Sequence, residues 1–166
     1  MWRLSYTEPM GGGIVLRDVQ ESDLTVFFEQ QLDPEASRMA AFPSRGRDAF
    51  MAHWAKIMAD ETTTLQTVIF RGRVAGNIVS WEQSGERNVG YWFGKEYWGQ
   101  GIASAALLQF LQRVMTRPLH AHVAKHNAAS IRVLQKCGFT IAGEVKFSDA
   151  DGQQGEEFIL TLGPAV

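Results

Sequence analysis

The segment from Gly90 to Ser104 places the tightest constraint on the fold, because it joins three local patterns in a row. An aromatic run with strand character leads into a turn that contains Gly99 and Gly101, and an apolar helical pattern begins directly after this turn. The first N–H groups of a helix have no partner inside the helix and carry the positive end of its dipole. The small residues of the turn let another group approach them closely. The segment therefore predicts a strand–turn–helix unit that can bind a phosphate.

Two common phosphate-binding motifs do not match this segment. No Gly-Lys-Ser/Thr sequence follows the turn, which excludes the P-loop. The third glycine and the downstream acidic residue of the dinucleotide-binding motif are also missing from the sequence. Taken alone, the glycine spacing is equally consistent with a tight turn that binds no ligand.

Hydrophobic periodicity along the chain predicts one mixed sheet with helices on both of its faces. Residues 34–47 are expected to form a shaped loop or a short helix. The expected strands are 14–19, 65–70, 74–81, 88–93, 119–124, 139–145 and 158–162, and the expected helices are 23–32, 48–60, 99–116 and 128–137. The resulting order, β-α-α-β-β-β-α-β-α-β-β, belongs to the α/β class.

Glycines at 11–13 follow Pro9 and predict a flexible joint near the N-terminus. The joint divides the chain into an N-terminal arm, residues 1–12, and a domain, residues 13–163. Apolar and polar residues alternate in the arm, a pattern compatible with an added edge strand.

Length, charge and cysteine content limit the functions that are compatible with the chain. Its 166 residues suit one domain, and 16 basic against 18 acidic residues leave no basic excess for binding nucleic acid. Cys137 is the only cysteine, so no intramolecular disulfide can form and a reduced, cytoplasmic location is expected. Neither a secretory signal nor a membrane-spanning segment is expected, because the apolar runs are too short.

A second segment, NAASIRVLQKCGF at residues 127–139, changes the interpretation of the first. Together with YWFGKEYWGQGIASAAL at residues 91–107, it resembles the GNAT superfamily of acetyl-CoA-dependent N-acetyltransferases. Within that superfamily the likeness is strongest to the branch that acetylates the N-termini of ribosomal proteins. The resemblance covers about residues 13–163 and implies the GNAT acyl-CoA N-acyltransferase fold, with acetyl-CoA as the acyl donor and no metal.

The resemblance implies a donor site made mostly from main-chain groups. The family's pyrophosphate loop falls on Trp98, Gly101 and Ala103, and Trp98 departs from the basic or amide residue usual at the first position. The strand before the loop is expected to splay from its neighbour and pair with the pantetheine arm. The implied donor-binding residues are Trp92, Phe93, Gly99, Gln100, Gly101, Ile102, Ala103, Ser104 and Asn127.

Two positions that carry catalytic residues in the family hold other residues in this sequence. Leu134 stands where many family members carry a tyrosine general acid, so Ser130 is the available residue to steady or protonate the departing thiolate. Asn88 occupies the place expected for a glutamate base and cannot accept the amine proton. Glu82, His120 or a water chain to bulk solvent are the alternatives for that role.

Several single residues allow other interpretations. His120, His122 and His126 are potential metal ligands, but no Cys, Asp or Glu lies close by in sequence, so ordinary polar positions are favoured. Cys137 precedes a helix-ending glycine, where a structural thiol is favoured over a nucleophile. The aromatic residues of the helix at 48–60 are expected in the core or in an acceptor cleft, and the arginines of residues 34–47 in a solvated loop or facing an acidic acceptor.

The predicted function is transfer of acetyl from acetyl-CoA to a primary amine by direct attack in a ternary complex. A protein or peptide N-terminus is favoured as the acceptor by the branch likeness. A small amine, such as an amino acid, polyamine or antibiotic, is the alternative acceptor. A non-catalytic acyl-CoA-binding module and a scaffold protein remain alternatives of other classes, and the sequence allows a monomer or a homodimer.

Overall fold

The computed structural model describes residues 13–148 and 152–164, and their strands form one seven-stranded sheet of order β1-β2-β3-β4-β5-β7-β6. The arm predicted at residues 1–12 lies outside the described residues. The strands are β1 (Ile14–Asp18), β2 (Thr64–Phe70), β3 (Arg73–Gln83), β4 (Glu86–Phe93), β5 (Leu119–Ala124), β6 (Thr140–Ser148) and β7 (Gln154–Leu162). The helices are α1 (Asp23–Gln31), α2 (Pro34–Ala40), α3 (Arg47–Ala59), the short 3-10 helix η1 (Lys95–Tyr97), α4 (Ile102–Leu111) and α5 (Ala128–Lys136).

The sheet forks between β4 and β5. Strands β1 to β4 form an antiparallel meander, whereas β5 pairs antiparallel with β7. The parallel junction between β4 and β5 consists only of the pairs Arg87–Leu119 and Asn88–His120. Beyond these pairs, residues 89–93 of β4 stay bound to β3 but have no partner on the β5 side. The mixed sheet predicted from sequence is therefore confirmed, and its two halves meet at a narrow junction.

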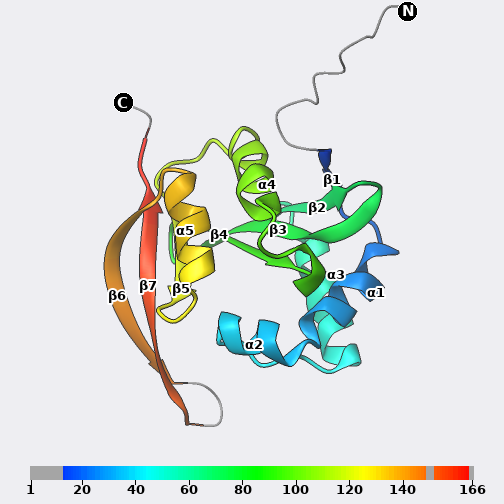
Figure 1. Cartoon of the computed structure of the whole chain (residues 1–166), viewed down its shortest axis with the longest axis horizontal. Coiled ribbons are helices and arrows are strands. Elements are labelled where there is room, and N and C mark those ends of the chain that lie inside the picture. The colour runs from blue at the N-terminus through cyan, green and yellow to red at the C-terminus, as the bar shows by residue number, and fades with distance from the viewer. Residues whose placement is uncertain (1–12, 149–151, 165–166) are drawn as a thin grey trace, which may run out of the picture.

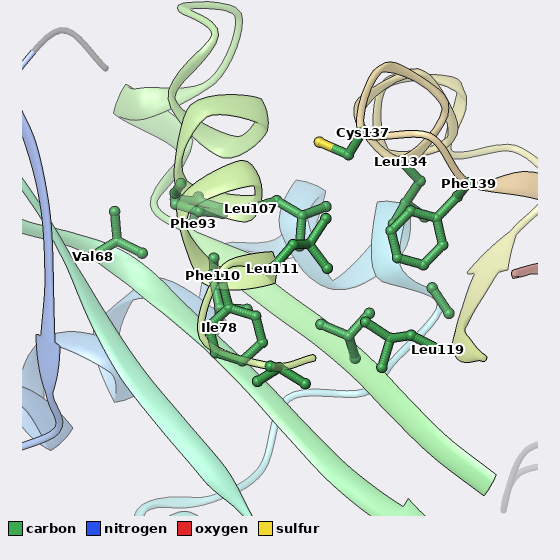
Figure 2. Packing of buried hydrophobic residues seen from close by; sticks show 14 of the residues in the cluster. Val68, Ile78, Phe93, Leu107, Phe110, Leu111, Leu119, Leu134, Cys137 and Phe139 are labelled. Atoms are coloured by element: carbon green, nitrogen blue, oxygen red, sulfur yellow. The ribbon is translucent and has the colours of Figure 1, made fainter. Parts of the chain in front are cut away.

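Helices cover both faces of the sheet, as predicted. Helices α4 and α5 lie side by side in front of the sheet in Figure 1, over the larger apolar core. Figure 2 shows side chains of α4, among them Leu107 and Phe110, directed toward strand residues such as Ile78. On the opposite face, α1 and α3 pack a smaller core around Phe27. The ring centroids of Phe27 and Trp54 lie 5.0 Å apart. The α1/α3 core thus packs against β3, the strand that stays paired with β4 beyond the fork.

A buried ion pair fixes the start of α1. The Asp23 carboxylate accepts hydrogen bonds from Arg17 at 2.6 and 2.8 Å, from the Gln20 N–H at 2.9 Å and from the Thr67 hydroxyl at 2.7 Å. Burial alone would raise the pKa of Asp23, but these hydrogen bonds outweigh burial and hold the pKa below its ordinary value. Ser22 is the N-cap residue of α1, and its side chain makes no capping hydrogen bond.

We expect this pair to make folding stability depend on acid pH. A carboxyl group whose pKa is depressed by folding adds stability above its unfolded pKa of about 3.9, and that stability is lost as pH falls through the folded pKa. Urea unfolding between about pH 5 and about pH 2 should therefore show a steeper loss for the wild type than for Asp23→Asn. Equal slopes would contradict this account of Asp23.

The structure corrects several predicted boundaries. The segment at 34–47 contains α2, so three helices rather than two separate β1 from β2. The helix predicted at 99–116 spans only residues 102–111. The glycines before it adopt left-handed φ angles, which sets its start at Ile102. The strands predicted at 139–145 and 158–162 are the longer β6 and β7, whose ladder extends from Thr140–Thr161 to Ser148–Gln154. The connection between β6 and β7 is shorter than the predicted strand ends imply, and part of it lies outside the described residues.

Candidate functional site

The N-terminus of α4 is open in the way that the glycine pattern predicts. Gly99 and Gly101 have φ angles of +73° and +77°, a region that suits glycine. A Cβ built at either position would meet no atom within 4 Å, so the space beside the turn is empty. Gly101 is the N-cap of α4, and as a glycine it has no side chain that could cap the helix. The first N–H groups of α4 are therefore left for an outside acceptor.

Side chains near the turn bond back to the chain and leave this space clear. The indole N–H of Trp98 donates to the Phe93 carbonyl at 3.1 Å. The side-chain amide of Gln100 donates to the Glu96 carbonyl at 2.8 Å. Neither side chain fills the space in front of the α4 amides.

The free edge of β4 lies between this turn and α5. Residues 89–93 leave β5 at the fork, and η1 then connects the end of β4 to the glycine turn. The Tyr91 hydroxyl joins β4 to α5, because it lies 2.6 Å from the Ser130 hydroxyl. A pantetheine chain placed along this edge would find the main-chain groups that β5 leaves unpaired.

The start of α5 brings Asn127 and Ser130 together. Asn127 is the N-cap of α5, and its side-chain oxygen accepts the Ser130 N–H at 3.2 Å. The NH₂ group of Asn127 makes no hydrogen bond within the described part of the chain and stays available as a donor. Burial raises the pKa of Tyr91 to about 12, so its hydroxyl stays protonated, and either hydroxyl can be the donor in its contact with Ser130. Sequence analysis missed the Tyr91–Ser130 pair, since the two residues belong to distant elements.

Leu134 and Cys137 face the core. Leu134 is fully buried, and Cys137 is buried where its thiol reaches the Ser104 carbonyl at 3.6 Å. Burial raises the pKa of the Cys137 thiol, which disfavours the thiolate that a nucleophile needs. The favoured interpretation of Cys137 as a buried structural thiol is confirmed.

A cleft of about 450 Å³ opens on the α1/α3 face and reaches the forked part of β4. The β4 residues in its wall are Gly90, Tyr91 and Trp92, so the cleft approaches the free edge from the side opposite α4 and α5. The rest of its wall comes from α1, the loop after α2, α3, the loop before β2 and β3. These lining residues are Phe27, Gln31, Phe42, Arg45, Phe50, His53, Trp54, Ile57, Asp60, Thr63, Asn77, Val79, Trp81 and Glu82.

The candidate bases lie in different surroundings. Glu82 is exposed at the rim of the cleft, near the end of β3. His120 lies on β5 beside Asn88, and its Nδ1 is 2.9 Å from the Thr161 hydroxyl, outside the cleft wall. His53, which sequence analysis did not single out, lines the cleft, and burial followed by the charges of Arg45 and Lys56 lowers its pKa.

The three histidines considered as metal ligands are not gathered into one cluster. His122 contacts Glu157 at 2.9 Å, and His126 contacts the Arg38 carbonyl at 2.7 Å. Among residues 13–148 and 152–164, no group of three or more His, Cys, Asp or Glu side chains is placed to hold a metal ion. The same residues include no helix long and apolar enough to cross a membrane.

Comparisons with known proteins agree with this geometry. The model of the acetyltransferase (GNAT) domain family matches residues 14–140, so the chain belongs to the GNAT acetyltransferase family. None of the curated protein sequences is similar enough to be matched. The seven-stranded mixed sheet with helices on both faces is thus the GNAT fold, as expected from the sequence.

Solved structures share this fold at low sequence identity. Spermidine N-acetyltransferase from Vibrio cholerae, solved with CoA and spermine, is 16% identical with a TM-score of 0.77, over 91% of this chain and 95% of that one. RimL, a ribosomal L7/L12 alpha-N-protein acetyltransferase solved with coenzyme A, is 18% identical with a TM-score of 0.76. The match covers 94% of this chain and 97% of RimL. RimJ from Mycobacterium smegmatis, solved with CoA-disulfide, is 22% identical with a TM-score of 0.75. The match covers 93% of this chain and 83% of RimJ.

Proposed function

We propose that this protein transfers acetyl from acetyl-CoA to a primary amine. The observation that carries the proposal is the fork at β4, where a free strand edge leads directly to the uncapped, glycine-lined N-terminus of α4. The two features suit the two parts of one ligand, an amide-containing arm and a diphosphate. The transferase domain is taken as residues 13–163, since β7 continues to Leu162 beyond the family match.

The donor would bind mainly to main-chain groups. The diphosphate accepts hydrogen bonds from the N–H groups of Ile102, Ala103 and Ser104, and the glycines at 99 and 101 leave room for it. Gln100 forms part of the turn through its main chain, because its side chain bonds Glu96. The arm pairs with Trp92 and Phe93 on β4 and accepts a hydrogen bond from the Asn127 NH₂ group.

The reaction would proceed by direct attack of the amine. The neutral amine nitrogen forms a bond to the thioester carbonyl carbon, and the carbonyl oxygen becomes an oxyanion that a β4 main-chain N–H near Trp92 stabilises. The C–S bond then breaks, and the departing thiolate takes a proton from the Ser130 hydroxyl. Tyr91 hydrogen-bonds Ser130 and can replace that proton, and solvent water then returns a proton to Tyr91. The ammonium proton leaves to a base, for which Glu82 at the cleft rim, His120 or a water chain remain the candidates.

The cleft on the α1/α3 face would hold the acceptor, since it meets the free edge of β4. The sequence motifs favour a peptide or protein N-terminus of the ribosomal-protein type. A small amine is the second candidate, because the cleft volume of about 450 Å³ lies in the range of small-molecule sites. Release of CoA thiol with a panel of amines tests the proposal, and binding of acetyl-CoA without turnover of any amine would identify a non-catalytic module instead.

We expect the hydroxyl pair to affect turnover more than binding. Ser130→Ala removes the group next to the leaving sulfur, and kcat should fall about 10- to 100-fold. This is at or below the lower end of the usual range for acid–base groups, because a thiolate leaves readily. Tyr91→Phe should lower kcat less, since Ser130 remains. Both variants should keep the acetyl-CoA Kd of the wild type.

Ser22→Ala is the matched control for this prediction, because Ser22 is exposed and its side chain makes no capping bond. Glu82→Gln and the exposed Glu86→Gln form a second pair that tests the base. A role for Glu82 requires that only Glu82→Gln shifts the pH profile of kcat/KM. An unchanged kcat in Ser130→Ala would remove Ser130 from the mechanism.

A further inference from the structure

The wall of the acceptor cleft is dominated by aromatic rings. Trp81 and Trp92 contribute from the sheet, and Phe42 contributes from the loop after α2, where it is 45% exposed. The ring of Trp81 extends over Gly90, since a Cβ at Gly90 would lie 3.3 Å from the ring. Phe50 and Trp54 line the cleft from α3. Rings on several sides of a cleft favour a ligand with an apolar, flat group.

The cleft offers little to a polycation. Asp60 already accepts the Thr62 N–H at 2.9 Å and the Thr62 hydroxyl at 2.6 Å. Glu82 is the other carboxylate in the wall, and Arg45 adds a positive charge to the same wall. The lowered pKa of His53 favours its uncharged form at neutral pH. A polyamine or an aminoglycoside, with several ammonium groups, would need more free carboxylates than this wall supplies.

One buried amide in the wall lacks a partner. Asn77 is 7% exposed, lies in the middle of β3 opposite Trp92, and lines the cleft. Its side chain makes no hydrogen bond within residues 13–148 and 152–164. Gln31, the other amide side chain of the wall, bonds the Arg45 N–H at 2.8 Å and the Arg45 carbonyl at 3.1 Å. Solvent in the cleft reaches the polar atoms of Asn77, so its side-chain amide is available to bond a polar group on the ligand.

We propose that the cleft accepts a primary amine that carries an aromatic side group and a neutral hydrogen-bonding group, the latter paired with the side-chain amide of Asn77. The aromatic group lies among Trp81, Trp92 and Phe42, and the amine faces the free edge of β4. This inference rests on the proposed function. A free aromatic amine and a peptide that begins with an aromatic residue share this chemistry.

A panel of acceptors tests the class. We expect kcat/KM for phenylalanine amide to exceed that for alanine amide at least about 10-fold, and spermidine and kanamycin to be the poorest substrates. The peptide Phe-Ala-Ala distinguishes the two sources, since a higher kcat/KM than for phenylalanine amide indicates a peptide N-terminus. Equal rates for the two amides, or preference for spermidine or kanamycin, would overturn the inference while leaving the transferase function intact. Binding of acetyl-CoA without acetylation of any amine would reject the transferase function itself.

Two variants test the assigned residues. Asn77→Leu keeps the side-chain size but loses the amide, so the KM for phenylalanine amide should rise about 10-fold at an unchanged acetyl-CoA Kd. Phe42→Ala changes an exposed ring outside the core and should reduce the preference for phenylalanine amide over alanine amide. Gln66→Met is the control, because Gln66 is as buried as Asn77 but its side-chain amide donates to Asp18. This variant should leave the KM values for phenylalanine amide and alanine amide unchanged. Wild-type KM values in folded Asn77→Leu and Phe42→Ala proteins would overturn the assignment of these two residues to acceptor binding. If Asn77→Leu does not fold, the result for Phe42→Ala alone decides.

Discussion

Gly101→Val should abolish the stabilisation of the protein by acetyl-CoA. The Val side chain would occupy the empty space beside the α4 amides, which is the space assigned to the diphosphate. At a ligand concentration of about 100 times the wild-type Kd, the wild type should gain roughly 2.7 kcal/mol. An affinity loss of about 100-fold would reduce this gain to about 0.4 kcal/mol in the variant, which thermal unfolding with and without acetyl-CoA measures.

Gly72→Val is the matched control for this prediction. Gly72 has a φ of +78°, close to the +77° of Gly101, and a Cβ there would also meet no atom within 4 Å. Both variants should therefore carry a similar backbone strain of about 1–3 kcal/mol. Gly72 lies in the turn between β2 and β3, so its variant should keep the full response to acetyl-CoA. A full response in Gly101→Val would remove the α4 turn from the donor site.

Gly76→Ala should lower the free energy of unfolding by about 3 kcal/mol, the upper end of the usual range for overpacking. A Cβ at Gly76 would lie 2.1 Å from the Trp92 carbonyl oxygen and 2.9 Å from the Phe93 Cα. Both atoms belong to the backbone, so β3 and β4 would have to separate where β4 has already lost β5. Urea unfolding measures the effect, and the acetyl-CoA Kd should rise as well, because the displaced residues are those assigned to the pantetheine arm.

Gly90→Ala provides the comparison on the same strand pair. Its Cβ would meet only the ring tip of Trp81, at 3.3 Å, and this side chain can move. We expect a loss below about 1 kcal/mol. Equal losses for the two variants would show that the close approach at Gly76 does not limit the pairing of β3 and β4.

The parts of the site that sequence predicts are those encoded locally. The glycine turn and the start of the following helix depend on residues 99–104, and the N-cap role of Asn127 depends on the residues directly after it. These features follow from backbone preferences that act over a few residues. Sequence alone does not decide between a loop and a short helix after Asp33, because the seven residues of α2 give too little periodicity.

Other parts of the site depend on register between distant segments. The Tyr91–Ser130 contact joins residues 39 positions apart, and Asn77 meets the cleft only because β3 pairs with β4 in one register. His53 lies on a helix whose apolar pattern indicates a core face but not the cleft beside it. Local patterns carry no information on which side chains meet across the sheet.

The fork also has a mechanical consequence. The two halves of the sheet, β1 to β4 and β5 to β7, share only two residue pairs in their ladder. A donor molecule bound in the gap would form hydrogen bonds with both halves of the sheet, in the way that an additional strand would. Loading the protein with its acyl donor should then stiffen the whole sheet, so amides along β4 and β5 should exchange with deuterium more slowly in the loaded protein than in the empty one.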